Sequence, residues 1–168
     1  MLVLFSFTGI ILAAIAWQDF KFRAVYWWLF PLLLMVLGLA KIWQTDSKQM
    51  TTDLLYNSAF LALQMFVLSL YFSFKLGKWV NVFDGYFGLG DLFFLLSIAP
   101  YFSFINYVFF YLLSLFIAIV LNFFKKENTE IPLAGQQALA LLLVILLDQT
   151  MIKLDLTSGI WLNNYLNI

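Results

Sequence analysis

The sequence predicts an all-α polytopic membrane protein with about six transmembrane helices, and three observations lead to this prediction. Hydrophobic residues make up 64% of the 168 residues and charged residues only 11%, whereas soluble domains carry about 25% charged residues. Charge-free stretches recur along the chain at lengths near the ~20 residues that cross a bilayer. These stretches are continuously apolar and lack the two-residue alternation of a barrel strand. We therefore expect residues 1–168 to form one membrane-embedded domain.

The first three predicted helices cover residues 2–18, 24–43 and 54–74. Each lies on a stretch that is free of charge or nearly so, and charged connections separate them. A cleaved signal peptide is the alternative interpretation of the first helix. It is disfavoured because a signal peptide begins with basic residues, and Met1 to Phe7 contain none.

The second half of the chain contains a charge-free stretch of 33 residues, 92–124. One helix of that length would extend about 50 Å, which exceeds the ~30 Å hydrocarbon core. The Pro, Ser and Asn residues near position 100 favour a turn, so we expect two helices, 89–104 and 105–124. A sixth helix is predicted at 131–148, where Pro132 suits a first helical turn. Residues 149–168 are expected to form an interfacial tail.

Lysine and arginine counts predict the orientation of the chain in the membrane. Alternate connections carry six basic residues on one side and three on the other; the six are Lys21, Arg23, Lys75, Lys78, Lys125 and Lys126, and the three are Lys41, Lys48 and Lys153. Since basic residues concentrate on the cytoplasmic side, the N-terminus is expected outside.

The composition excludes several classes of function. The chain has no Cys and no His, which excludes disulfides, thiolate nucleophiles, Ser-His-Asp triads and His- or Cys-ligated metals. Nine basic and nine acidic residues give a formal charge of zero, so we expect no nucleic-acid partner. We also expect no cofactor and no metal. Any chemistry must therefore use carboxylates, amines, hydroxyls or the backbone.

Two aspartates stand out because each lies at the end of an apolar stretch. Asp19 follows the first predicted span and Asp91 begins the fourth, with two crossings between them. Both should therefore lie on the same side of the membrane, the cytoplasmic side by the basic-residue counts. Two carboxyl groups brought close together share a proton and can act as an acid–base pair on water. Gly88 and Gly90 would permit the close approach.

Each aspartate also has a purely structural interpretation. Asp91 could be a helix N-cap, which stabilises a helix by about 1 kcal/mol. Asp19 could end a span and pair with Lys21 or Arg23. These two basic residues could contact a substrate or anionic lipid headgroups. Asp84 could be a third carboxylate or a turn residue beside Gly85.

Three glutamines lie inside apolar stretches and have packing as their default role. Gln64, Gln136 and Gln137 are expected to form hydrogen bonds between helices.

The sequence around the two aspartates resembles the type IV prepilin peptidases, which are GxGD intramembrane aspartyl proteases. Gly88-Leu89-Gly90-Asp91 matches the GxGD signature, and residues 19–27 resemble the family's first aspartate region, an Asp followed by basic residues and a short apolar step. Residues 130–134 resemble the Pro-containing start of its last span. The resemblance covers nearly the whole chain. It implies an aspartic endopeptidase in which Asp19 and Asp91 are catalytic.

The resemblance further implies a prokaryotic cytoplasmic-membrane enzyme whose substrate is a prepilin-like membrane protein. The chain is similar to a short form, without the Cys-rich insert of the members that also methylate the product. It differs from the family pattern at Tyr26-Trp27, where Pro-Asn is usual, and at Phe93, where Lys is usual. The alternative function is a small transporter or a non-catalytic assembly subunit. The sequence indicates no particular oligomeric state.

Overall fold

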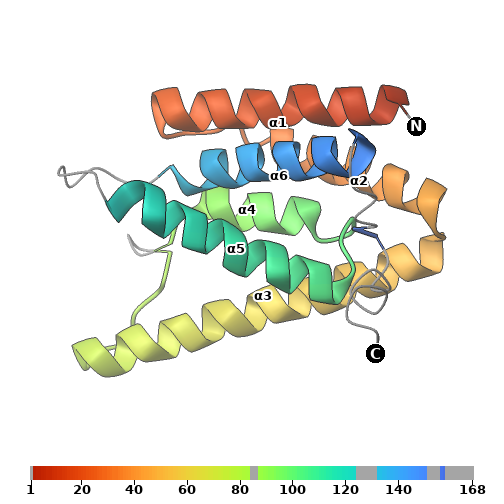
Figure 1. Cartoon of the computed structure of the whole chain (residues 1–168). Coiled ribbons are helices and arrows are strands. Elements are labelled where there is room, and N and C mark those ends of the chain that lie inside the picture. The colour runs from red at the N-terminus through yellow and green to blue at the C-terminus, as the bar shows by residue number, and fades with distance from the viewer. Residues whose placement is uncertain (1, 84–86, 124–131, 151–155, 158–168) are drawn as a thin grey trace.

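The computed structural model describes residues 2–83, 87–123, 132–150 and 156–157. Over these ranges the chain is all-helical, with six helices and no strands (Figure 1). The helices are α1 (Leu2–Phe22), α2 (Leu29–Gln44), α3 (Ser47–Leu76), α4 (Leu89–Ile98), α5 (Phe104–Phe123) and α6 (Leu133–Thr150).

Three of these helices are long and apolar enough to cross a membrane: Val3–Phe22 of α1, all of α3 and all of α5. The other three are apolar but shorter, and α4 has only 10 residues. At about 1.5 Å per residue α4 is about 15 Å long, half the thickness of the hydrocarbon core. The structure therefore agrees with an all-helical membrane protein, and six complete spans are not confirmed.

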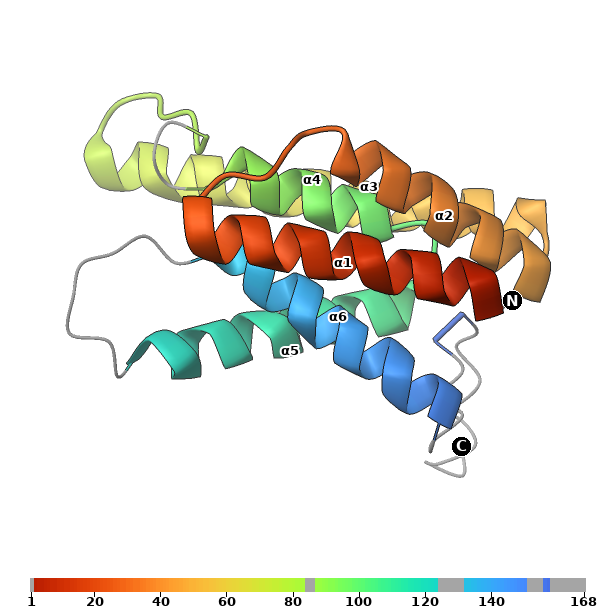
Figure 2. The ribbon, with the colours of Figure 1, turned by 90° about the horizontal axis from the view of Figure 1, so that it is seen from above.

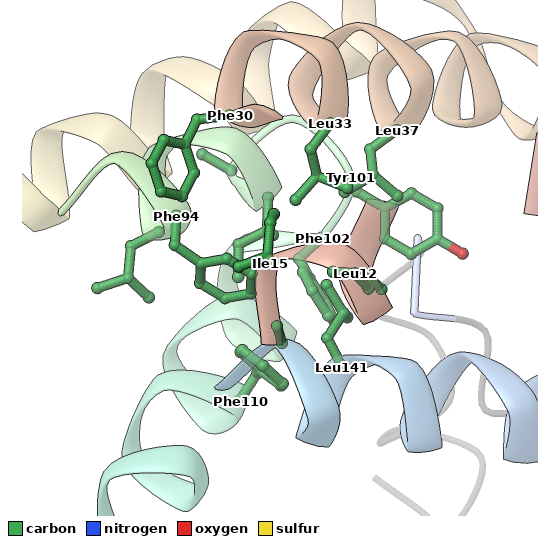
Figure 3. Packing of buried hydrophobic residues seen from close by; sticks show 14 of the residues in the cluster. Leu12, Ile15, Phe30, Leu33, Leu37, Phe94, Tyr101, Phe102, Phe110 and Leu141 are labelled. Atoms are coloured by element: carbon green, nitrogen blue, oxygen red, sulfur yellow. The ribbon is translucent and has the colours of Figure 1, made fainter. Parts of the chain in front are cut away.

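The six helices pack into one bundle in which α4 is an inner element. Helix α1 lies along α6 and also contacts α2, while α4 contacts α2, α3 and α6 (Figures 1 and 2). Apolar side chains from all six described helices meet in a common core, with Leu61 contributed by α3. Figure 3 shows Leu12 and Ile15 of α1, Leu33 and Leu37 of α2, Phe94 of α4, Phe110 of α5 and Leu141 of α6.

Helix α1 is longer than the sequence predicts. It continues past residue 18 to Phe22, so that Asp19 lies in its last turn and not in the connection after it. Arg23, with a backbone φ of 53°, then ends the helix. This left-handed conformation is unfavourable by about 1–2 kcal/mol for a residue with a side chain. The predicted second helix also begins later than expected, at Leu29, because residues 24–28 form a non-helical connection.

The connection predicted between the second and third helices, residues 44–53, is wrong, because helices α2 and α3 cover nearly all of it. Only Thr45 and Asp46 separate the two helices. Asp46 is the N-cap of α3, and its side chain accepts a hydrogen bond of 2.6 Å from the amide of Gln49. An aspartate cap of this kind starts a helix well before the apolar stretch begins, and α3 therefore has 30 residues.

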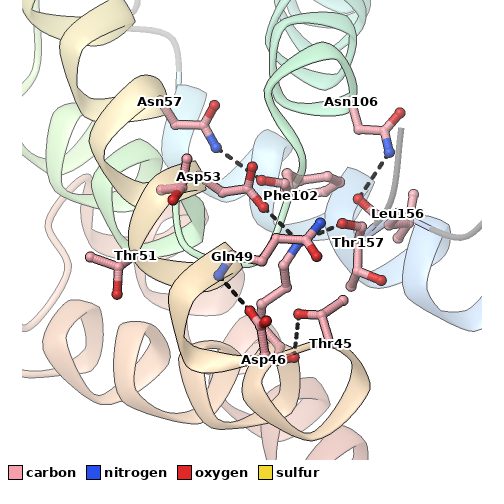
Figure 4. A network of polar contacts seen from close by, with 12 residues as sticks. Thr45, Asp46, Gln49, Thr51, Asp53, Asn57, Phe102, Asn106, Leu156 and Thr157 are labelled. Atoms are coloured by element: carbon pink, nitrogen blue, oxygen red, sulfur yellow. Dashed lines mark hydrogen bonds and ion pairs between the residues drawn. The ribbon is translucent and has the colours of Figure 1, made fainter. Parts of the chain in front are cut away.

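Lys41 and Asp53 form a buried ion pair at the α2–α3 end of the bundle. The Lys41 Nζ lies 2.8 Å from Asp53 Oδ2, and the Lys41 side chain is completely buried. Lys41 also donates a hydrogen bond to the carbonyl oxygen of Thr157, and Asn106 donates one to that of Leu156 (Figure 4). Lys41 is thus a buried partner of Asp53 and not a free connection charge, and the orientation expected from the lysine and arginine counts stays a prediction.

Helix α4 ends earlier than the predicted boundary at residue 104. It stops at Ile98, and the chain turns through Pro100, which cannot continue a helix because it lacks the amide hydrogen. Buried Asn57 of α3 donates hydrogen bonds to the carbonyl oxygens of Ala99 and Phe102, at 2.7 and 3.0 Å. The Asn57 side chain thus gives two carbonyl oxygens of the buried turn a hydrogen-bond donor, and it holds the turn against α3. The predicted split of the 33-residue stretch near Pro100 is therefore confirmed.

The expected glutamine hydrogen bonds are present between helices. Gln137 of α6 donates to Ser114 of α5, and Gln64 of α3 accepts from the hydroxyl of Tyr111, both at 3.2 Å. Gln136 accepts from Asn122 at 3.3 Å. Helices α5 and α6 begin and end within two residues of their predicted bounds. Of the predicted tail only positions 149–150, in α6, and Leu156 and Thr157 belong to the described residues.

Candidate active site

Asp19 is buried in the last turn of α1, against the first turn of α6. Its side-chain oxygen Oδ2 accepts a hydrogen bond of 2.6 Å from the amide of Gly135. A Cβ atom at position 135 would lie 3.0 Å from that oxygen and 3.3 Å from the backbone oxygen of Ala16. The absence of a side chain at Gly135 therefore lets α6 approach α1 closely enough for its amide to reach the carboxyl group.

Asp91 lies in the first turn of α4 and is not the N-cap, because that position belongs to Gly88. Its carboxyl group is hydrogen-bonded by the backbone amides of Ala134 and Gly88. A Cβ atom at Gly88 would come within 2.7 Å of Asp91 Oδ2, so this conformation of the carboxyl group requires glycine there. A Cβ at Gly90 would meet nothing within 4 Å among the described residues. Of the two glycines in the GxGD pattern, the structure thus shows a steric need for glycine only at Gly88.

The first turn of α6 holds both carboxyl groups with two consecutive amides. The amide of Ala134 donates a hydrogen bond to the carboxyl group of Asp91, and the amide of Gly135 donates one to that of Asp19. The first amides of any helix lack partners within the helix, and Pro132, which precedes α6, has no side-chain acceptor to offer. The amides are also at the positive end of the helix dipole, which stabilises negative charge. Sequence reasoning missed Gly135, and the only signal was a small residue soon after Pro132.

The two aspartates line one cavity of about 300 Å³, which we call the aspartate cavity. Its walls come from α1, the connection after α1, the start of α4 and the start of α6; they are Asp19, Arg23, Ala24, Val25, Gly88, Gly90, Asp91 and Ala134. The two carboxyl groups are close enough to repel each other electrostatically, and the charge of Arg23 attracts Asp19. The cavity is therefore a polar hollow where three helix ends meet. The end of α1 and the starts of α4 and α6 lie at the opposite end of the bundle from the connection between α2 and α3 (Figure 1).

The other residues singled out in the sequence are distributed differently. Arg23 lines the aspartate cavity, whereas the Lys21 side chain lies over the rings of Trp17 and Phe22, with its Nζ 4.9 and 5.1 Å from their centroids. Asp84 lies outside the described residues. Within those residues no three acidic side chains gather as a metal site would require.

Two of the positions that differ from the family pattern lie together in a second cavity. Trp27 and Phe93 both line an apolar cavity of about 550 Å³ between α2 and α4. Phe93 also packs on Phe30, with ring centroids 6.0 Å apart. Neither aspartate lines this cavity, so the differences at Trp27 and Phe93 change a neighbouring apolar surface and not the polar hollow itself.

Comparisons of the chain with protein-family models, with curated proteins and with solved structures find no match. The function is therefore inferred from the geometry of the aspartate cavity and from the motifs around Asp19 and Asp91.

Proposed function

We propose that this protein is a membrane aspartic endopeptidase in which Asp19 and Asp91 activate water. The single observation that supports this most is the convergence of the two aspartates, 72 positions apart in the chain, on one cavity. Their surroundings add to it, since both carboxyl groups are held by amides of the same helix turn. Buried ionisable groups at the ends of apolar helices are costly and are usually functional.

In the proposed mechanism the two carboxyl groups hold one proton between them, because two adjacent charges repel. Asp19, which accepts from Gly135 and lies beside Arg23, acts as the carboxylate and takes a proton from water. Asp91 gives its proton to the oxygen of the substrate carbonyl as the water oxygen attacks the carbon. The resulting tetrahedral intermediate carries two hydroxyl groups. It collapses when Asp19 passes the proton that it took from water to the peptide nitrogen, Asp91 recovers a proton from one of these hydroxyl groups, and the C–N bond breaks to release the amine. This chemistry needs neither histidine nor cysteine.

The proposed substrate class follows from the resemblance to the prepilin peptidases. It is a prepilin-like membrane protein with a short basic leader in the cytoplasm and an apolar helix in the bilayer. Cleavage between the two parts would occur at the cytoplasmic face of a prokaryotic inner membrane. We expect no methylation of the new N-terminus, since the chain resembles the short form.

The direct test is cleavage of type IV prepilins by the purified protein in lipid nanodiscs. We expect a product whose new N-terminus, determined by mass spectrometry, lies between the leader and the apolar helix. A known prepilin peptidase run in parallel proves that each precursor can be cut. If the precursors are cut by that enzyme and bound but never cut by this protein, the peptidase proposal is wrong and a non-catalytic role replaces it.

Gly135→Ala is expected to lower kcat for prepilin cleavage by about 10- to 100-fold, since misplacement of a catalytic group by about 1 Å costs about 10² in rate. The added methyl group would lie 3.0 Å from Asp19 Oδ2 and push the carboxyl group away from the Gly135 amide.

Gly9→Ala is the matched control for this variant. Gly9 lies on α1, where among the described residues the new Cβ would meet only Leu142, at an ordinary 3.7 Å, and the variant should leave kcat unchanged. Equal rates for Gly135→Ala and the wild type would show that the amide of Gly135 does not position Asp19.

A further inference from the structure

The connection after α1 carries backbone groups that no other described residue uses. Arg23 donates its amide to the carbonyl of Asp19, and Tyr26 donates its amide to the side chain of Gln18, at 3.0 Å each. Between these two anchors, the amides and carbonyls of Ala24 and Val25 have no hydrogen-bond partner among the described residues. Ala24 is exposed and Val25 is half-buried, so these backbone groups are accessible to a partner from outside.

The same two residues separate two cavities. On one side Ala24 and Val25 line the aspartate cavity. On the other side they line a cavity of about 210 Å³, which we call the side cavity, together with Gln18, Phe22 and Tyr26. A drug-sized ligand needs about 300–1,000 Å³, so the side cavity suits a group of the size of one amino-acid side chain.

We propose that Ala24 and Val25 are the substrate-docking segment of this protein, and that the side cavity receives one apolar side chain next to the cut bond. The inference rests on the proposed peptidase function. An open segment of backbone between a polar cavity and a small pocket is what recognition of an extended peptide requires, because backbone hydrogen bonds hold the chain and a pocket selects alternate side chains. The aromatic rings of Phe22 and Tyr26 favour an apolar occupant.

Docking beside the aspartate cavity also gives the substrate a reason to leave its helical conformation. A helix satisfies its own backbone groups and presents no free carbonyl to an activated water. Pairing with Ala24 and Val25 would replace some of those hydrogen bonds as the substrate becomes extended. The tether from Tyr26 to Gln18 then matters, because it holds the connection against α1 at the height of Asp19.

The first test changes the backbone of the substrate. Synthetic precursor peptides carry an ester in place of one amide at each residue flanking the cut bond, with the cut amide itself unchanged. We expect at least one ester to raise KM by about 3- to 10-fold, in line with the loss of one hydrogen bond, while kcat stays within twofold. Esters farther than four residues from the cut should have no effect.

The second test changes the side cavity. Phe22→Ala enlarges it without touching the aspartate cavity, and a precursor series varies the side chain at each of the two residues on either side of the cut. At one of these positions we expect Phe22→Ala to prefer a larger side chain than the wild type does. The ratio of kcat/KM for the larger side chain to kcat/KM for the side chain that the wild type prefers should rise by about 10-fold or more. Phe74→Ala, which removes an exposed aromatic ring of α3, is the matched control and should keep the wild-type preference.

The outcomes separate this inference from the function on which it rests. If the wild type cuts the precursors but neither the esters nor Phe22→Ala change KM or preference, the docking segment is wrong and the peptidase proposal stands. If the wild type cuts no precursor that a known peptidase cuts, both proposals fail. A shift in preference for Phe22→Ala together with an ester effect at a flanking residue supports the docking segment.

Discussion

Asp19→Asn and Asp91→Asn are each expected to lower kcat/KM for prepilin cleavage by about 10³-fold or more. Asparagine has nearly the shape of aspartate and can still accept a hydrogen bond from the amides of Ala134 and Gly135. It cannot take a proton from water or give one to a carbonyl oxygen, and a positioned acid or base contributes about 10²–10⁴ in rate. The measurement is single-turnover cleavage of a prepilin in nanodiscs.

The double variant adds a sharper expectation. If Asp19 and Asp91 act as one unit, replacing both should cost little more than replacing one, because groups that act together are not additive. If the two aspartates instead had independent structural roles, each at its own helix end, the effects of the two single substitutions would add in the double variant.

Asp46→Asn is the matched control for these substitutions. Asp46 caps α3 at the opposite end of the bundle and is exposed, and asparagine caps a helix about as well as aspartate. This variant should therefore retain full activity. Full activity in Asp19→Asn or Asp91→Asn would contradict the proposed mechanism, and altered transport or complex assembly with intact prepilin processing would favour the alternative function.

Asp53→Ala is expected to lower the free energy of unfolding by about 3–5 kcal/mol. It would leave the fully buried Lys41 ammonium group without its carboxylate, and breaking a buried pair by removing one partner costs about that much. Among the described residues, Lys41 would retain its hydrogen bond to the carbonyl oxygen of Thr157 (Figure 4). Equilibrium unfolding in detergent measures the change, and prepilin cleavage by the folded fraction should be unaffected.

The variant Lys41→Met with Asp53→Leu should recover most of the lost stability. Two apolar side chains of similar size often replace a buried ion pair without loss. Lys48→Ala, which removes an exposed charge in the first turn of α3, should change the free energy of unfolding by less than about 0.5 kcal/mol. A small effect of Asp53→Ala comparable to that of Lys48→Ala would mean that water reaches Lys41 and that the pair is not buried in the membrane-embedded protein.

The helical fold could be predicted from the sequence because charge-free stretches near 20 residues long have few alternatives in a bilayer. Helix ends were predicted less well. Capping by Asp46 lengthened α3 towards its N-terminus, and the turn at Pro100 shortened α4. The ends of these helices depend on single hydrogen bonds and on a few residues. The mean apolar content of a stretch, from which the helices were predicted, does not detect such local features.

The candidate site could be predicted in part. Asp19 and Asp91 were found from their positions at span ends and from the GxGD pattern, and the number of crossings between them predicted one side of the membrane. The contribution of α6 was not found, because neither Ala134 nor Gly135 carries a functional side chain. Their amides matter only where α6 meets α1 and α4.

By itself the sequence determined that this chain is apolar and helical enough for a bilayer, because its composition makes burial of its apolar surface in water-soluble form too costly. It also limited the chemistry open to the chain, because the absence of Cys and His excludes thiolate and histidine-based mechanisms. Only the tertiary structure decided that Lys41 and Asp53 are a buried pair, that Gly88 and Gly135 are the close-contact glycines, and that Ala24 and Val25 lie between two cavities. These facts depend on distances between segments far apart in the chain, and such distances follow from how the helices pack and not from any local pattern.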